Sequence, residues 1–195
     1  MKKFLVITAL FMVIINVVKL FIPNDITPKV NELHSYCKKN GYNTDYCILV
    51  DFSKYSGLDR FYIYSFKENK IVHRSLCAQG HGPYYNIFVK KYSNKHGSNL
   101  SSLGKYKVGR FRKMYTPGWF IKDGFEVHGL DRTNSNAHSR GILIHNGNPC
   151  FQTFPLPSMP VSHGCFGVSS SMIEHIKELT SKSKKPILLY AYDEK

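Results

Sequence analysis

The segment Pro160-Val-Ser-His-Gly-Cys-Phe-Gly-Val168 holds the residue types of a nucleophilic site. Cys165 follows Gly164, and a glycine permits a tight turn that leaves backbone N–H groups facing outward beside the sulfur. A cysteine nucleophile needs a basic partner, N–H donors for the oxyanion, and access to substrate. His145, at the end of the apolar run 141–145, is the candidate base, and the N–H groups of Gly164 and Cys165 are candidate donors.

Two other interpretations of these residues stay open at this point. In the first, Cys165 is one half of a disulfide, and His145 is a core histidine whose hydrogen bonds are made within the protein. In the second, His145, His163 and Cys165 hold a zinc ion, because all three are good zinc ligands. Spacing along the chain does not decide among the three interpretations.

Four further cysteines lack the glycine-flanked setting of Cys165. They are Cys37, Cys47, Cys77 and Cys150. In an oxidising compartment four of the five cysteines can pair, and the sequence does not choose the connectivity. We expect these four to be the disulfide candidates, which leaves Cys165 as a free thiol.

Alternating short strands must position these residues. We expect a helix over 30–40 that stops at Gly41, a hairpin of strands over 60–66 and 70–76, and a helix from a capping box at Ser171 to about Ser183. Further strands are expected over 48–52, 105–111, 125–130, 141–145 and 187–192. Many strands with two helices predict a mainly β, α+β single domain. The usual nucleotide-binding and zinc patterns are absent from the sequence.

The amino terminus has the layout of an export signal. Met1-Lys2-Lys3 precedes the apolar run 4–18, and no A-x-A cleavage pattern follows it. We therefore expect residues 1–23 to be a cleaved signal or an uncleaved anchor, 24–45 a linker and helix, and 46–195 the catalytic domain. The domain is expected to be exported to the periplasm or cell envelope, with 4–22 as the anchor if the signal is retained.

The chain is strongly basic. Its 195 residues carry a formal net charge of +14, while 14% aromatic residues exclude a disordered chain. Such a charge favours an anionic partner, here a cell-wall polymer, or serves solubility alone. Export argues against nucleic acid, and we expect a monomer.

Ser162-His163-Gly164-Cys165 resembles the S-x-G-C signature of murein L,D-transpeptidases, with His145 at the place of that family's upstream histidine. The resemblance covers about residues 46–192 and is closest to the branch named murein L,D-transpeptidase catalytic domain family. It extends to Asp51, Ser56-Gly57, Arg60, Gly80-His81-Gly82, Tyr92-Ser93-Asn94, Gly97-Ser98, Ser101-Ser102-Leu103-Gly104, Gly129-Leu130-Asp131, Asn134-Ser135-Asn136-Ala137, Arg140-Gly141 and Ile144-His145.

The resemblance implies a β-sandwich or barrel of L,D-transpeptidase type, with a helix after the Cys165 segment and no cofactor. Cys165 would attack the amide between the third residue of a peptidoglycan stem and the fourth, a D-alanine. His145 would maintain a thiolate–imidazolium pair and protonate the leaving amine. A second stem's amine then gives a cross-link, and water gives a carboxypeptidase.

The sequence departs from the family's best-known members after the cysteine, where Phe166-Gly167 replaces an apolar residue followed by arginine. Arg140 or Arg132 is expected to orient substrate instead, with a plain surface charge as the alternative for each. Ser162 either orients His145 and the loop or is an ordinary turn hydroxyl. Candidate substrate contacts are His81, Ser101, Ser102, Arg140 and His163, the last expected to be exposed.

Three functions are consistent with these residues. The first is an exported cysteine L,D-transpeptidase or L,D-carboxypeptidase acting on peptidoglycan. The second is a zinc-dependent cell-wall hydrolase. The third is a binding module that keeps the fold, has little or no activity, and adheres to anionic wall polymers through its basic surface.

Overall fold

The computed structural model describes residues 25–83, 90–116, 121–146 and 162–194. The predicted signal or anchor over 1–23 and Cys150 lie outside these residues. The chain divides into two compact units, Met1–Asn31 and Glu32–Lys195, and the whole sheet belongs to the second. Within the described ranges, every helix is too short or too polar to cross a bilayer.

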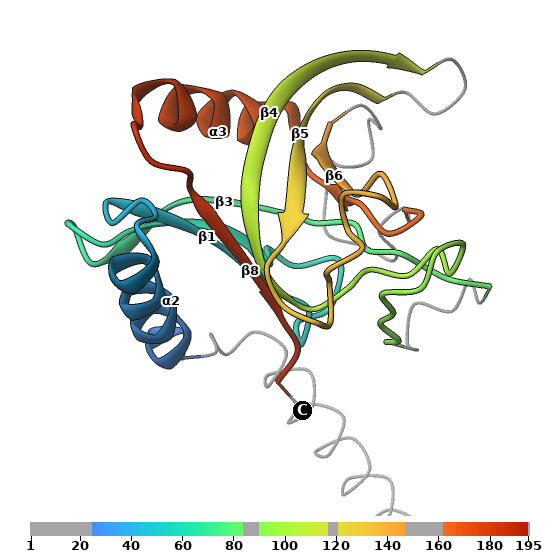
Figure 1. Ribbon diagram of the computed structural model, residues 1–195, viewed down its shortest axis with the longest axis horizontal. Helices are drawn as coiled ribbons and strands as arrows, with labels where there is room; N and C mark the ends of the chain where they lie inside the picture. Colours follow the sequence, from blue (N-terminus) through green and yellow to red (C-terminus); the bar gives the residue numbers. More distant parts are fainter. Residues whose placement is uncertain (1–24, 84–89, 117–120, 147–161, 195) are drawn as a thin grey trace, which may run out of the picture. The chain divides into compact units, whose positions relative to one another are not determined.

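The second unit is built on one mixed sheet of eight strands, in the order β3-β2-β1-β8-β4-β5-β6-β7 (Figure 1). Its two parallel pairs are β1 with β8 and β6 with β7, and the other neighbours are antiparallel. The described elements are α2 (Thr27–Asn40), β1 (Tyr46–Asp51), β2 (Phe61–Ser65), β3 (Lys70–Ser75), β4 (Gly104–Thr116), β5 (Ile121–Gly129), β6 (Leu143–His145), β7 (Phe166–Gly167), α3 (Ser170–Lys182) and β8 (Leu188–Tyr192).

The predicted mainly β fold, with some helix and a helix following Cys165, is confirmed. The predicted capping box at Ser171 is wrong. Ser169 is the N-cap of α3, since its Oγ accepts the Met172 N–H group at 3.2 Å. The middle strands β4 and β5 also begin or end beyond the predicted limits, because their pairing extends well past the apolar runs that suggested them.

The hydrophobic core lies on one face of the strands β5, β6 and β7. Phe125, Ile144 and Phe166 are neighbours in the registers of these strands and are almost fully buried. The apolar side of α3 packs into the same cluster through Met172, Ile173 and Ile176. Because side chains alternate along a strand, the residues flanking Ile144, namely Leu143 and His145, point to the opposite face of the sheet.

The predicted disulfides among Cys37, Cys47 and Cys77 are not formed, and all three are buried free thiols. Each is completely enclosed by the apolar interior, where an unpaired cysteine packs as a small hydrophobic side chain. Burial raises the pKa of Cys37 to about 11, so these thiols stay protonated. Cys165 is also a free thiol, but only half-buried.

Candidate active site

The turn before Cys165 requires glycine at position 164. Gly164 has φ +114°, a conformation that side chains disfavour, and its carbon lies against neighbouring atoms. A Cβ built there would lie 2.7 Å from Ile142 Cδ1 and 2.9 Å from the Leu100 carbonyl oxygen. Any larger residue would therefore displace the turn and the thiol that follows it.

Ser162 closes this turn with its hydroxyl group. Its Oγ donates to the Cys165 carbonyl oxygen at 2.7 Å and accepts the Gly164 N–H group at 3.2 Å. The predicted oxyanion donor at Gly164 is thus engaged within the turn in this structure. The Ser162 backbone also forms hydrogen bonds with the backbone of Gln79 and His81, and these bonds attach the turn to the segment 78–82.

The parallel pairing of β6 and β7 brings Cys165 and His145 to one face of the sheet. Ile144 is aligned with Phe166 and His145 with Gly167, so Cys165 comes beside Leu143. His145 ends β6 and Cys165 immediately precedes β7, so by the alternation of side chains both point away from the core. Gly167, the direct neighbour of His145, has no side chain to stand between them.

Burial favours a neutral cysteine and a neutral histidine. It raises the pKa of Cys165 to about 11, although the Leu143 N–H group and Arg140 both act to lower it. It also lowers the pKa of His145, a shift that the hydrogen bond to Asn146 partly opposes. Both shifts favour the neutral thiol and the neutral imidazole, whereas the family resemblance implies a thiolate–imidazolium pair.

The His145 ring is oriented by Asn146, a residue that the sequence did not single out. His145 Nδ1 lies 3.0 Å from the Asn146 carbonyl oxygen. Because a carbonyl oxygen only accepts, Nδ1 carries the proton, and the neutral ring keeps its lone pair on Nε2. Asn146 is itself held by two hydrogen bonds with the backbone of Asp123 and one to Ser170. In the sequence, the available signal for this role was an asparagine directly after a histidine that ends a strand.

The Ser101 side chain also links the turn to the segment 78–82. Its buried hydroxyl accepts the Gly80 N–H group at 2.9 Å and donates to the Gly164 carbonyl oxygen at 3.1 Å. The predicted substrate contact is thus a buried brace of the turn. A direct contact between Ser101 and substrate remains a prediction.

Arg140 and Ser102 hold the loop 93–102 together. The Arg140 guanidinium donates to the carbonyl oxygens of Ser93, at 2.8 Å, and of Leu100. It also donates to the hydroxyls of Ser98, at 3.1 Å, and Ser102, at 2.8 Å. The arginine that we expected to orient substrate therefore donates hydrogen bonds to four acceptor groups of the protein itself.

His81 and His163 form the rim of the turn. Their rings lie 5.2 Å apart in an edge-to-face arrangement, and His163 is exposed, as expected. The zinc hypothesis is not supported, because His163 faces His81 and the ligand atoms of His145, His163 and Cys165 do not converge. In the described part of the chain, the three potential ligands that do converge are Glu126, His128 and His138, with donor atoms within 4.8 Å of one another.

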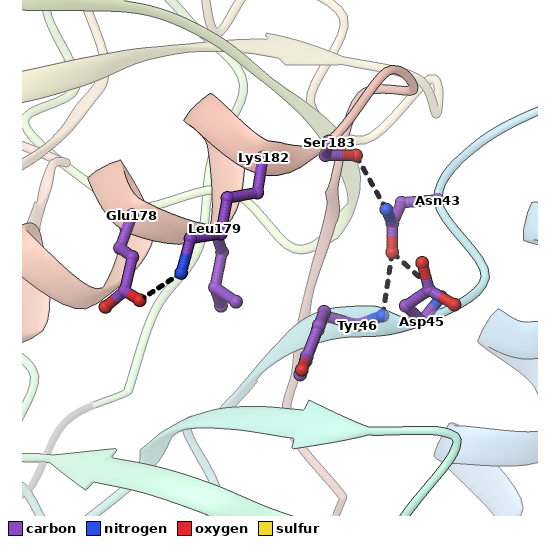
Figure 2. Close-up of a pocket in the computed structure, with 7 residues that line it drawn as sticks. All are labelled: Asn43, Asp45, Tyr46, Glu178, Leu179, Lys182 and Ser183. Atoms are coloured by element: carbon purple, nitrogen blue, oxygen red, sulfur yellow. Dashed lines mark hydrogen bonds and ion pairs between the residues drawn. The ribbon is translucent and has the colours of Figure 1, made fainter.

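A pocket of about 200 Å³ lies elsewhere, at the end of α3 and the start of β1. Figure 2 shows its polar groups engaged with one another: Ser183 with Asn43, and Lys182 with Glu178. It is lined by Asn43, Asp45, Tyr46, Glu178, Leu179, Lys182 and Ser183, none of which is a predicted site residue.

Comparison with known proteins identifies one family. The family model described as L,D-transpeptidase catalytic domain matches residues 24–192. No curated protein sequence matches the chain significantly.

Similar solved structures share little sequence with this chain. An L,D-transpeptidase from Mycobacterium smegmatis is 8% identical with a TM-score of 0.44, over 76% of this chain and 58% of its own. The helical cell shape determining protein Pgp2 (K307A mutant) from Campylobacter jejuni is 15% identical with a TM-score of 0.47, over 89% and 58%. Bd1075 from Bdellovibrio bacteriovorus is 14% identical with a TM-score of 0.48, over 78% and 49%. The matched part is thus about half to three fifths of each of these chains.

Proposed function

The chain belongs to the L,D-transpeptidase catalytic domain family, and on this premise we propose that it is a cysteine transpeptidase of peptidoglycan stem peptides. Cys165 forms a thioester with the stem, and an amine or water resolves it, giving a cross-link or a carboxypeptidase product. The observation that carries the proposal is the register of β6 and β7, which sets a partly exposed free thiol and an oriented imidazole on one face.

The mechanism begins from the neutral pair. As the Cys165 sulfur bonds to the scissile carbonyl carbon, the thiol proton passes to Nε2 of His145, which makes His145 a general base. The oxyanion collapses to a thioester, the C–N bond breaks, and the leaving amine takes the proton from His145. In the second half, the acceptor amine or water gives its proton to Nε2, attacks the thioester, and the sulfur leaves with that proton.

Export and cell-wall binding complete the proposal. The basic run and apolar stretch at 1–23 direct the chain to the periplasm or cell envelope, as a cleaved signal or as an anchor over 4–22. The surplus of 27 basic over 13 acidic residues supports attraction to an anionic wall polymer. The protein acts as a monomer, without a cofactor.

Intact-mass spectrometry with a carbapenem tests the nucleophile. The wild-type chain is expected to gain one β-lactam as a thioester, while Cys165→Ala gains none and keeps the wild-type melting temperature. Stem tetrapeptides with and without an amine acceptor then separate cross-linking from trimming. A stoichiometric adduct on a residue other than Cys165 would contradict the proposed nucleophile.

A binding module without turnover is the second candidate. Two observations favour it: burial raises the pKa of Cys165 to about 11, and the Gly164 N–H group is engaged by Ser162. Its signature would be sacculus binding by wild type and Cys165→Ala alike, with no muropeptide turnover by either.

A further inference from the structure

A row of aligned residues crosses four strands on the face that carries His145. Arg112 of β4 is aligned with Gly124 of β5, Gly124 with His145 of β6, and His145 with Gly167 of β7. Residues aligned in this way point to the same side of a sheet. Two of the four positions are glycine, so Arg112 and His145 are the only side chains of this row.

The two arginines on this face of β4 are fixed by one buried carboxylate. Glu126, aligned with Leu143, has 6% of its side chain exposed, and it pairs with Arg112 and with Arg110 at 3.5 Å. Burial alone would raise the pKa of Glu126, but the two guanidinium groups hold it below its usual value. The carboxylate is therefore ionised, and it pairs with two arginine side chains that stay 80% (Arg110) and 53% (Arg112) exposed.

The charge of this cluster is positive. One carboxylate balances only one of the two arginines, and Lys107 adds a further positive charge beside His128 on the same face. A fixed guanidinium with donors still facing solvent is well suited to a carboxylate, because its planar fork matches two oxygen atoms and little entropy is lost on binding.

The gap between Arg112 and His145 fits a short peptide, and Cys165 leads into β7, the strand beyond His145. Aligned Cα atoms of antiparallel strands are about 4.5–5.5 Å apart, so Arg112 and His145 are separated by roughly 10 Å across Gly124. An extended residue spans about 3.3–3.6 Å, and an arginine side chain covers most of the remainder. Met114 Cε, 2.9 Å from where a Gly124 Cβ would lie, gives this gap an apolar floor.

We propose that Arg112, held with Arg110 on Glu126, binds a free carboxylate of the peptide whose carbonyl Cys165 attacks. The proposal rests on the proposed function and assigns Arg112 a role in substrate selection. Peptides with a free carboxylate one or two residues from the scissile bond are its preferred substrates, and C-terminal amides are poor ones.

The same neighbourhood does not favour a metal ion. Glu126, His128 and His138 bring their donor atoms within 4.8 Å of one another. However, the Glu126 carboxylate is already paired with Arg112 and Arg110. Burial, and after it the charges of His138, Lys107 and Arg110, lower the pKa of His128. A divalent cation would enter against three positive charges, so the electrostatics favour an anion.

Kinetics with two matched peptides test the proposal. The substrates are a stem tetrapeptide ending in a free carboxylate and the same peptide as its C-terminal amide. Wild type is expected to prefer the carboxylate in kcat/KM by about 10- to 100-fold, the range for losing a hydrogen bond to a charged group. Arg112→Gln should remove most of this preference by raising KM for the carboxylate alone, and Arg112→Lys should restore part of it.

Arg74→Gln is the matched control, since Arg74 is an exposed strand arginine of β3 and should leave both substrates unchanged. Binding is measured separately by calorimetry on Cys165→Ala, alone and with Arg112→Gln. Equal turnover of carboxylate and amide by wild type would overturn this proposal and leave the proposed function standing. No turnover of either peptide, with no binding to Cys165→Ala, would overturn both. Melting temperatures identify any variant that fails to fold.

Discussion

The chemistry of the site depends on how burial acts on two side chains. It raises the pKa of Cys165 and lowers that of His145, so both effects favour the uncharged form of each side chain. A neutral thiol is a weak nucleophile, so in the proposed mechanism the imidazole takes the proton during attack. The hydrogen bond from Nδ1 to Asn146 makes Nε2 the basic atom, and it is the residue-level feature that best fits this role.

The pH dependence follows from these directions. Because the pKa of Cys165 is about 11, its alkylation by iodoacetamide should accelerate about tenfold per pH unit between pH 7 and 10. Peptide turnover should instead stay level down to about pH 6.5 and fall only below it, since His145 titrates below the ordinary histidine value of 6.5. Stopped-time mass spectrometry of Cys165 and a pH–rate profile measure the two. A Cys165 alkylation rate that is flat above pH 7 would show a resting thiolate.

Short elements, not long ones, hold the nucleophile in place. The β7 strand is two residues long, and the turn before it is fixed by Ser101 from the loop 93–102, by the bridge between Gly80 and Ser162, and by β6. Arg140 stabilises the first of these contacts indirectly, because it collects four acceptors of that loop. Arg140 and Arg112 thus have different roles: Arg140 binds groups of the protein itself, and we propose that Arg112 binds substrate.

Arg140→Ala should destabilise the protein, because it leaves several half-buried carbonyl and hydroxyl groups without a donor. We expect a loss of about 3 kcal/mol in the free energy of unfolding, the range for a charged hydrogen-bonding group. Activity should fall alike for the carboxylate and amide peptides. Urea denaturation with the kinetics of both peptides measures this. Wild-type stability combined with lost carboxylate preference would instead make Arg140 the substrate arginine.

At the scale of the whole molecule, one continuous sheet brings separate chain segments to a single face. Cys165, His145, Glu126 and Arg112 come from four consecutive strands of that sheet, β7 to β4, or from the turn that leads into them. The basic surplus of the chain is a different kind of feature, since it acts over several ångströms and needs no fixed geometry.

Sacculus binding should therefore depend on salt. The chain carries a net charge of +14, and screening shortens the reach of surface charges from about 10 Å at 0.1 M to about 3 Å at 1 M salt. Cys165→Ala, which cannot turn over substrate, should bind purified sacculi at least tenfold more weakly in 0.5 M than in 0.05 M NaCl. Pull-down with quantitative blotting measures it. Salt-independent binding would assign the affinity to specific contacts alone.

The sequence by itself determined the composition of the site and most of the elements. The glycine-flanked Cys165, the strand-ending His145 and the apolar runs are local patterns, and local patterns follow from steric and hydrophobic periodicity. The helix α3 and the hairpin β2–β3 could be predicted for the same reason. The N-cap of α3 could not, because Ser169 and Ser171 are equally good caps, and packing of Met172 and Ile173 decides between them.

Tertiary structure alone decided which polar residues meet. Arg140 and Arg112 are both arginines in a basic chain, yet one is enclosed by four acceptors and the other lies in the row of His145, because strand register is set by pairing over long separations. The free state of Cys37, Cys47 and Cys77 likewise depends on where the core encloses them. The protonation of Cys165 and His145 was also beyond the sequence, since desolvation is a property of the folded surroundings and not of the residue.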